Sequence, residues 1–367
     1  MELSWKLTVY RKWDEVDDSG FLSRWLSWLE KAPDAHVFIH PSIVKSWTDV
    51  HRKIQDISPL YCIGEYDNTI FFLPLVIWRR NWKNAFVRVI VPAGYSDYDY
   101  HDPLITRDVS DAVQKSFWKM ITKRVFNDTK LGYDEIDLPG IRMNIADEHW
   151  LIDKDVCPYK DLRKYEDFEH FFQDLSRNTR HGIRRQKRML DELGDVRYHV
   201  YKPDEIDEAL AAVPKFLKTH SLRWPNAYKA PELYETIIRN AIGYQQLVHF
   251  SELRVNSEPI SWELGFRYKQ KAYTYMGAFV DAYAKYSPGK IHLLSLLEDS
   301  IKSGMHVFDH LRGAHAYKEG WSDDKYVIYK YYRRAIGIKN RFKLFSRDVL
   351  QSIRSFFMIS TTLCIFC

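Results

Sequence analysis

The chain has 367 residues, of which 46% are hydrophobic and 28% charged, and its formal net charge is +5. This length and apolar content predict a large core and about two domains, while the small net charge excludes any argument for nucleic acid from charge alone. Four scattered cysteines and the lack of a charged-then-apolar N-terminal segment exclude a disulfide framework and a secretory signal, and favour a reducing, cytoplasmic setting. No stretch approaches the roughly 18 apolar residues that cross a bilayer.

The first part of the chain predicts mixed α/β structure. Residues 5–10 alternate as a strand, and helices are predicted near residues 21–29 and over residues 42–54. Strands over 60–66 and 69–78 flank Asp67-Asn68, a pair that tolerates the positive φ of a hairpin turn. A third strand (85–94), a helix (108–125) and a short strand (133–140) follow.

The same order recurs in the second part, where strands, helices and a three-strand meander follow from Val196 to Leu311. Gly94 and Gly277 end the two meanders in matching places, and IDLPG matches FDHLRG. We therefore predict two copies of one α/β unit, each a mixed, mostly antiparallel sheet flanked by helices. The expected domains are 1–150, 151–338 and a tail at 339–367.

A helix start in the second copy is suited to binding an anion. Ser287 is placed as the N-cap, Pro288 fits the first helical position, and Gly289 lets a ligand approach the next amides. The positive end of the helix dipole and Lys290 favour a phosphate or pyrophosphate there. The first copy lacks this motif, although Ser-Pro-Gly is also an ordinary way to begin a helix.

Between the copies, residues 167–194 predict one charged helix. Its arginines include Arg184 and Arg185, and acids are nearly absent until Asp191. Guanidinium groups grip phosphate oxygens in pairs, so this face is a candidate binder of a phosphate-bearing substrate. A solvated helix face is the alternative.

Five motifs carry a resemblance to a known family: AGYSDYDYHDPL, RNTRHGIRRQKRML, THSLRW, YSPGKIHLLSLLEDSIKSG and FDHLRGAHAYKEGW. The chain resembles, from about Ser42 to Lys330, the bacterial GNAT-superfamily acetyltransferase family associated with cellulose and exopolysaccharide biosynthesis. That family is a tandem-GNAT group related to Fem-type peptidyltransferases. The resemblance implies tandem GNAT-like domains, the first degenerate and the second holding acyl-CoA as donor substrate at Ser287 to Lys290. It also implies acyl transfer to an amine or hydroxyl of a sugar, lipid or other envelope precursor.

Such a reaction needs a group that accepts a proton from the acceptor and one that protonates the leaving thiolate. His220 is the first candidate base because its ordinary pKa lies near neutrality, and capping of a helix end is its alternative role. Asp309 is the second candidate base, unless Arg312 or Lys318 engages it. Tyr275, Tyr286 and Tyr317 are candidate proton donors, with Tyr317 preferred. The candidate substrate-binding residues are Asp99, Asp102, Arg184, Arg185, Arg223, Trp224 and Lys318.

Two further hypotheses concern partners. The alternatives to an acyl-CoA enzyme are a Fem-like peptidyltransferase that uses aminoacyl-tRNA and a non-catalytic assembly protein of a polysaccharide machine. Otherwise no nucleic acid and no metal is expected, since Cys364 and Cys367 lack a second pair of ligands. From Asn340, apolar and basic residues alternate as in an amphipathic helix, which predicts peripheral contact with the inner membrane or packing on the second domain.

Overall fold

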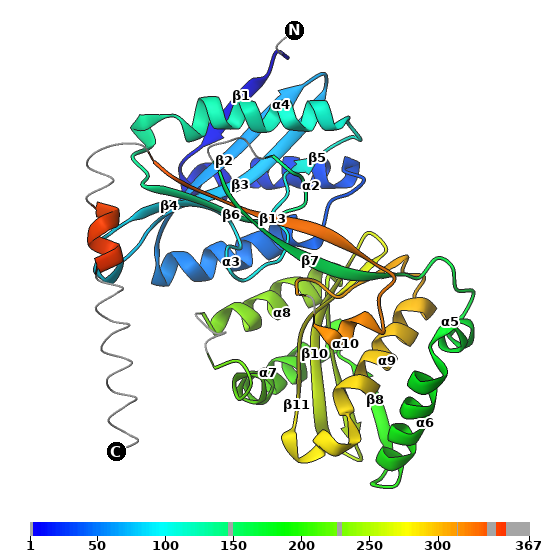
Figure 1. The fold of residues 1–367 in the computed structure, drawn as a ribbon. Coiled ribbons are helices and arrows are strands. Elements are labelled where there is room, and N and C mark those ends of the chain that lie inside the picture. The colour runs from blue at the N-terminus through cyan, green and yellow to red at the C-terminus, as the bar shows by residue number, and fades with distance from the viewer. Residues whose placement is uncertain (1–2, 146–149, 226–229, 314, 336–342, 350–367) are drawn as a thin grey trace. The chain divides into compact units, whose positions relative to one another are not determined.

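The chain divides into two compact units (Figure 1). A computed structural model describes residues 3–145, 150–225, 230–313, 315–335 and 343–349. Unit 1 comprises residues 1–44, 51–154 and 328–367, and unit 2 comprises residues 45–50 and 155–327. The predicted boundary at 150/151 lies close to the first division at 154/155. The predicted end of the second domain at 338 differs, because the last strand continues into unit 1.

Unit 1 is a mixed sheet with helices on both faces. Its strands lie in the order β1-β2-β3-β4-β6-β13, with β5 paired to β3. All neighbouring pairs are antiparallel except β4 and β6, which are parallel. The elements are β1 (Lys6–Tyr10), α1 (Trp13–Val16), α2 (Ser19–Lys31), α3 (Pro41–Ile54), β2 (Asp56–Tyr66), β3 (Thr69–Arg79), β4 (Arg88–Pro92), β5 (Leu104–Ile105), α4 (Asp111–Ile121), β6 (Glu135–Ile141) and β13 (Asp324–Arg334).

Side chains alternate along the central strands of unit 1, so that each face of the sheet has its own hydrophobic core. Leu60 and Cys62 of β2 lie in the same buried cluster as Phe117 of α4. Tyr61, between them, points to the opposite face and contacts Trp25 of α2, with ring centroids 6.0 Å apart. Because side chains alternate across a strand, one sequence run fills both layers. The turn at Asp67 and Asn68 has φ of 44° and 57°, which confirms the predicted hairpin.

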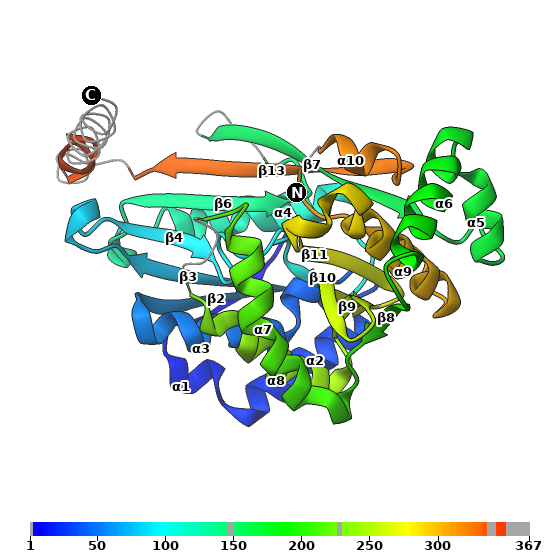
Figure 2. The same ribbon diagram turned by 90° about the horizontal axis from the view of Figure 1, so that it is seen from below.

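Unit 2 repeats this design. Its sheet has the order β7-β12-β11-β10-β9-β8, in which only β11 and β12 are parallel. Helices α5, α6 and α9 cover one face, and α7 and α8 cover the other (Figures 1 and 2). The elements are β7 (Leu151–Asp161), α5 (Phe168–Asp174), α6 (Arg177–Asp191), β8 (Val196–Val200), α7 (Ile206–Ser221), α8 (Glu232–Gln245), β9 (Val248–Val255), β10 (Glu258–Tyr268), β11 (Lys271–Phe279), the 3₁₀ helix η6 (Asp281–Tyr286), α9 (Pro288–Lys302), β12 (Val307–Asp309) and α10 (Ala316–Glu319).

The two units share the order strand, helices, three-strand meander, helix and strand, so the predicted duplication of the fold is confirmed. Two details of the prediction are wrong. Residues 167–194 form two helices, since Ser176 begins α6 and its side chain accepts a hydrogen bond from the Thr179 amide. Gly94 lies beyond β4 with φ of 96°, whereas Gly277 lies inside β11, so the two glycines are not equivalent.

The described part of the tail packs on unit 1. Residues 343–349 are helical, Leu344 is buried, and Lys343 and Arg347 form 2.5 Å ion pairs with Asp134 and Glu135. Two of the predicted basic residues thus neutralise buried carboxylates of the protein itself. The rest of the predicted amphipathic helix lies outside the described residues, so membrane contact stays a prediction. Within the described part of the chain, no helix is long and apolar enough to cross a membrane.

Candidate active site

The candidate site in unit 2 begins where two parallel strands diverge. β11 and β12 pair over three positions, ending at Tyr273 and Asp309. The chain then follows β7, because the amides of His310 and Gly313 donate to Pro158 and Val156 at 2.9 Å. β11 continues to Phe279 and remains paired with β10 on its other side. The backbone groups of residues 274–279 that point away from β10 therefore face the divergence, which we call the β11–β12 fork.

A β-bulge shapes the β11 side of the fork. The register between β10 and β11 shifts between Leu264 and Gly265, so that Tyr275 is the extra residue of β11. Such bulges twist a strand and change the direction of its side chains. After the bulge, Gly277 lies opposite Glu263 of β10, and its backbone is exposed.

Glu263 is held over Gly277 on the α9 face of the sheet. A Cβ atom at position 277 would lie 2.4 Å from Oε2 of Glu263, so a larger residue there would displace the end of this side chain. Ser261, two residues earlier on β10, contacts His292 of α9 at 3.0 Å, which fixes the face. Among the described residues, no hydrogen bond to the Glu263 carboxylate is found.

Burial gives Glu263 the pKa of a base that works near neutral pH. Removal from water raises its pKa from 4.5 to about 8, although the Lys318 ammonium opposes this rise. The side chain of Tyr317 in α10 is 63% exposed, and its partial burial, followed by the charge of Glu263, raises its pKa to about 12. The Tyr317 hydroxyl thus keeps its proton at neutral pH. A carboxyl with a raised pKa and a tyrosine that senses its charge therefore lie in the same region of unit 2.

The predicted anion-binding helix start is present, with a different cap. α9 begins at Pro288, and Ser287 is the N-cap in a left-handed conformation, with φ of 53° and ψ of 51°. The sequence predicted that its hydroxyl caps the helix, which is wrong. The hydroxyl instead accepts a 2.8 Å hydrogen bond from Gln186 of α6. The amide of Lys290 donates to the Ser287 carbonyl at 3.0 Å, while within the described residues the Gly289 amide has no backbone partner. One N–H group therefore remains free at the positive end of α9.

Helix α6 brings basic groups to this helix start. Gly182 faces Lys290, because a Cβ atom on the glycine would lie 3.7 Å from the lysine Nζ. Beside it is a hollow of about 500 Å³ lined by Arg177, Asn178, His181, Gly182 and Arg185. Arg184 points elsewhere, with its guanidinium 5.3 Å from the ring of Phe172 in α5. Arg185 therefore lines the hollow and Arg184 does not, although the sequence predicted the same role for both.

His220, the first candidate base, has a lower pKa than the sequence led us to expect. It lies in the last turn of α7, its ring is 6.2 Å from that of Phe216, and burial lowers its pKa to about 4. It is a much weaker proton acceptor than its ordinary pKa implied. Phe216 also contacts Phe250 of β9, and α7 covers the sheet face opposite α9.

Arg223 and Trp224, which follow α7, lie closer to the end of β11 and to α10. Arg223 lies 3.7 Å above the ring of Phe279, at the end of β11, and pairs with Asp281 at 3.2 Å. Trp224 is 53% exposed and lies 6.5 Å from His315, whose ring stacks on Tyr317 at 6.0 Å. An exposed aromatic surface therefore adjoins Tyr317, and the predicted roles of Arg223 and Trp224 in binding stay predictions.

Asp309 and Lys318 shape the other side of the fork. Asp309 is buried, and its carboxylate accepts a 2.8 Å hydrogen bond from the Leu311 amide, which forms the turn after β12. Lys318 donates to the carbonyls of His310 and Arg312 at 2.8 Å and to that of Leu311 at 3.2 Å. Both side chains stabilise the bend that makes the strands diverge.

The first copy contains a corresponding divergence that is filled by its own side chains. β4 and β6 pair only at Val89–Glu135 and Ile90–Ile136. Beyond this point the Tyr95 hydroxyl donates to Asp137 at 2.7 Å. Asp102 pairs with Arg142 at 2.6 Å and so has a structural partner. Asp99 contributes a carbonyl that closely approaches Gly140. Binding of an acceptor by Asp99 and Asp102 stays a prediction.

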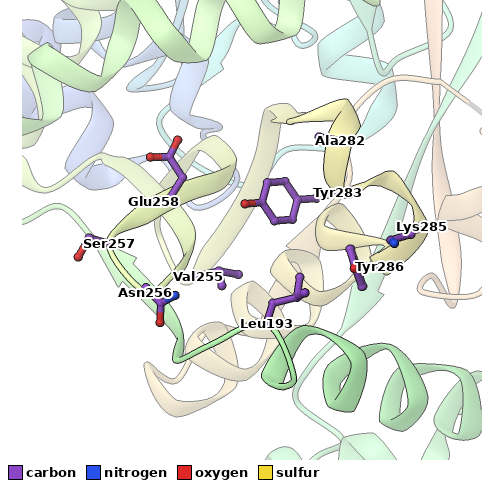
Figure 3. Close-up of a pocket in the computed structure, with 9 residues that line it drawn as sticks. All are labelled: Leu193, Val255, Asn256, Ser257, Glu258, Ala282, Tyr283, Lys285 and Tyr286. Carbon is purple, nitrogen blue, oxygen red and sulfur yellow. The ribbon is translucent and has the colours of Figure 1, made fainter.

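Another hollow in unit 2 is lined by η6 and by the turn between β9 and β10 (Figure 3). It measures about 600 Å³, and Tyr283 points into it between Glu258 and Tyr286. Glu258 is paired with Lys215 at 2.5 Å. None of the preferred catalytic or donor-binding candidates lines this hollow, so we place the active site at the fork and the start of α9.

Together, the element order of unit 2, the β11–β12 fork and the helix that follows it define a GNAT-like acyltransferase fold. The model of the acetyltransferase (GNAT) domain family matches residues 177–319, from α6 to α10. No curated protein matches the chain.

Solved structures show the same fold over most of the chain. FemX has a TM-score of 0.56 at 8% identity, with 86% of this chain and 96% of FemX covered. A conserved protein of unknown function from Bacteroides thetaiotaomicron has a TM-score of 0.54 at 11% identity, with 90% of this chain and 100% of that protein covered. The C-terminal DUF2156 domain of a candidate lysylphosphatidylglycerol synthetase from Agrobacterium fabrum has a TM-score of 0.50 at 12% identity, with 84% and 96% covered. At such identities the likeness concerns the fold alone.

Proposed function

We propose that unit 2 transfers an acyl group from acyl-CoA to an amine or hydroxyl of a sugar, lipid or other precursor of an exopolysaccharide or the cell envelope. The observation that carries this proposal is Glu263, a half-buried carboxyl whose pKa is raised to about 8 and which lies over the exposed backbone of Gly277. A perturbed titratable group at the fork of a GNAT-like fold is a candidate catalytic base.

The residues at the start of α9 fit a pyrophosphate. The free Gly289 amide and the helix dipole supply a partial positive charge, and Lys290 has no ion-pair partner among the described residues. The edge of β11 that points away from β10 offers backbone N–H and C=O groups to the amide-rich arm of the donor. Ser287, Pro288, Gly289 and Lys290 are therefore the residues that we propose for donor binding.

The donor supplies the acyl group as a thioester, which an amine or hydroxyl can attack. Glu263 accepts the proton of the attacking group, and above pH 8 it is ready to do so because it is then ionised. Tyr317 donates its proton to the sulfur that leaves. N–H groups of β11 that face the fork stabilise the negative charge on the carbonyl oxygen. The exposed surface of Trp224 and His315 lies where an acceptor would enter.

Binding of acyl-CoA and the Gly289→Glu variant test this proposal. The new carboxylate lies where the pyrophosphate is expected, so binding measured by calorimetry should be abolished. Gly289→Ala is the matched control. It adds only a Cβ atom, 3.3 Å from the Phe279 ring, and should weaken binding modestly. Acyl-CoA that binds Gly289→Glu as tightly as the wild type would overturn the donor assignment, and binding without turnover of any acceptor would favour the assembly protein.

A second candidate function is that of a Fem-like peptidyltransferase that uses aminoacyl-tRNA. It is favoured by α6, where Arg177, Arg185 and Arg188 have no acidic partner among the described residues. Affinity for tRNA should fall steeply with salt, with a logarithmic slope of roughly the number of phosphate contacts. Coenzyme A carries few charges and should show a shallow slope. A tight, salt-sensitive tRNA complex that is lost when these arginines are replaced would establish this alternative.

A further inference from the structure

The hollow on α6 carries basic side chains that have no acidic partner in the part of the chain that the structure describes. Arg177, His181 and Arg185 recur every four residues, so they form one stripe along the helix. None of the three has an ion pair or a side-chain hydrogen bond within the described part of the chain, whereas the neighbouring Arg180 donates to two backbone carbonyls. Arg177 and Arg185 therefore bring two positive charges to one side of α6. An anion in the hollow would neutralise these charges.

The hollow lies beside the start of α9 and is separate from it. Gly182 lines the hollow, and its lack of a side chain leaves the Lys290 ammonium within reach. Gln186, one turn further along α6, is bonded to Ser287. These contacts hold the two helices side by side, so that two positive groups adjoin. One comprises the Gly289 amide and Lys290, and the other comprises the α6 stripe.

Two adjoining positive groups fit a ligand that carries two separate phosphate groups. A nucleotide sugar carries only a pyrophosphate and would occupy one of them. Coenzyme A carries a pyrophosphate and, on the adenosine ribose, a separate 3′-phosphate. Resting on the proposed function, we propose that Arg177 and Arg185 bind this 3′-phosphate and make the enzyme prefer coenzyme A to its 3′-dephospho form. Guanidinium groups suit a terminal phosphate because they donate two parallel hydrogen bonds.

The test compares coenzyme A with 3′-dephospho-coenzyme A by isothermal titration calorimetry on the full chain. The wild type should bind coenzyme A about 10- to 100-fold more tightly, as expected for hydrogen bonds between charged groups. In Arg185→Ala this ratio should fall toward one while the affinity for the dephospho form stays unchanged. Arg177→Ala should act in the same direction. Arg184→Ala removes the same charge from the adjacent position, and since Arg184 packs on Phe172 it should keep the wild-type ratio.

The possible failures are distinguishable. A wild type that binds both ligands equally, or an Arg185→Ala variant that weakens both equally, overturns the 3′-phosphate site and leaves the proposed function intact. An equal loss of preference in Arg184→Ala would show a general effect of charge and would also overturn the site. A wild type that binds neither ligand overturns the proposed function itself. An RNA oligonucleotide that displaces coenzyme A from the stripe, with a steep salt dependence, would replace the proposed occupant.

Discussion

Replacing Glu263 by glutamine tests the catalytic assignment, because the side chain keeps its size and loses its ability to accept a proton. If Glu263 is the general base, Glu263→Gln should lower kcat by about 100- to 10,000-fold. Affinity for acyl-CoA should change little, since the donor is held mainly by the start of α9. In the wild type, kcat should rise with pH and level off above about pH 8, where the carboxyl is ionised. The residual rate of the variant should lack this rise.

The same substitution should change how stability depends on pH. Between pH 4.5 and about 8, the folded protein keeps on Glu263 a proton that the unfolded chain has lost. The raised pKa therefore makes the free energy of unfolding fall as pH rises through this window. The full difference between the two pKa values corresponds to about 5 kcal/mol. The glutamine variant avoids this loss and should gain stability relative to the wild type as pH rises.

Steady-state kinetics and urea unfolding at about pH 5 and about pH 9 measure both effects. Glu263→Asp is the matched control, since it keeps an ionisable group but withdraws it from Gly277, and it should retain a pH-dependent rate at reduced kcat. A Glu263→Gln variant with the wild-type rate would refute the catalytic role. A stability difference that does not depend on pH would refute the burial argument.

Three further substitutions test neighbouring features. Gly277→Ala places a Cβ atom 2.4 Å from the Glu263 carboxylate. It should lower kcat at least tenfold, as a small displacement of a catalytic group does, and leave the circular dichroism spectrum unchanged. An unchanged kcat would show that the carboxylate does not need this position. His220→Gln should cost less than about fivefold in kcat if Glu263 is the base, whereas a loss of about a hundredfold would return that role to His220. Arg347→Ala removes one cation from buried Glu135 and should lower the free energy of unfolding by about 1–3 kcal/mol, and an unchanged urea midpoint would refute this.

The local sequence determined much of the fold. The turn residues Asp67, Asn68 and Asn256 all have positive φ, as a short hairpin turn requires, and the meanders follow from them. Pro288 begins α9, and Gly304, with φ of 68°, follows its end. Such features depend on residues within one or two turns of the chain, so pattern and propensity suffice to predict them.

Strands β7 and β13 were not predicted, because charged residues interrupt their apolar alternation. They are stabilised by partners far away in the sequence: β13 pairs with β6, where Tyr331 lies opposite Leu138. The predicted helix over 167–194 was divided for a similar reason. Phe171 and Phe172 of α5 pack in the same core as Ile183 of α6, which requires a break between the helices.

The choice of the candidate catalytic residue depends on tertiary structure. The sequence drew attention to His220 because its ordinary pKa lies near neutrality, but burial lowers that pKa to about 4. Glu263 passed unnoticed, although a single acid in the apolar strand ISWELGF was an available signal. Its pKa rises because the fold removes the carboxyl from water, against the opposing charge of Lys318 from a distant part of the chain, and no local pattern records that environment. The sequence by itself determined the elements and the helix start, whereas only packing decided which titratable group is buried and what faces it.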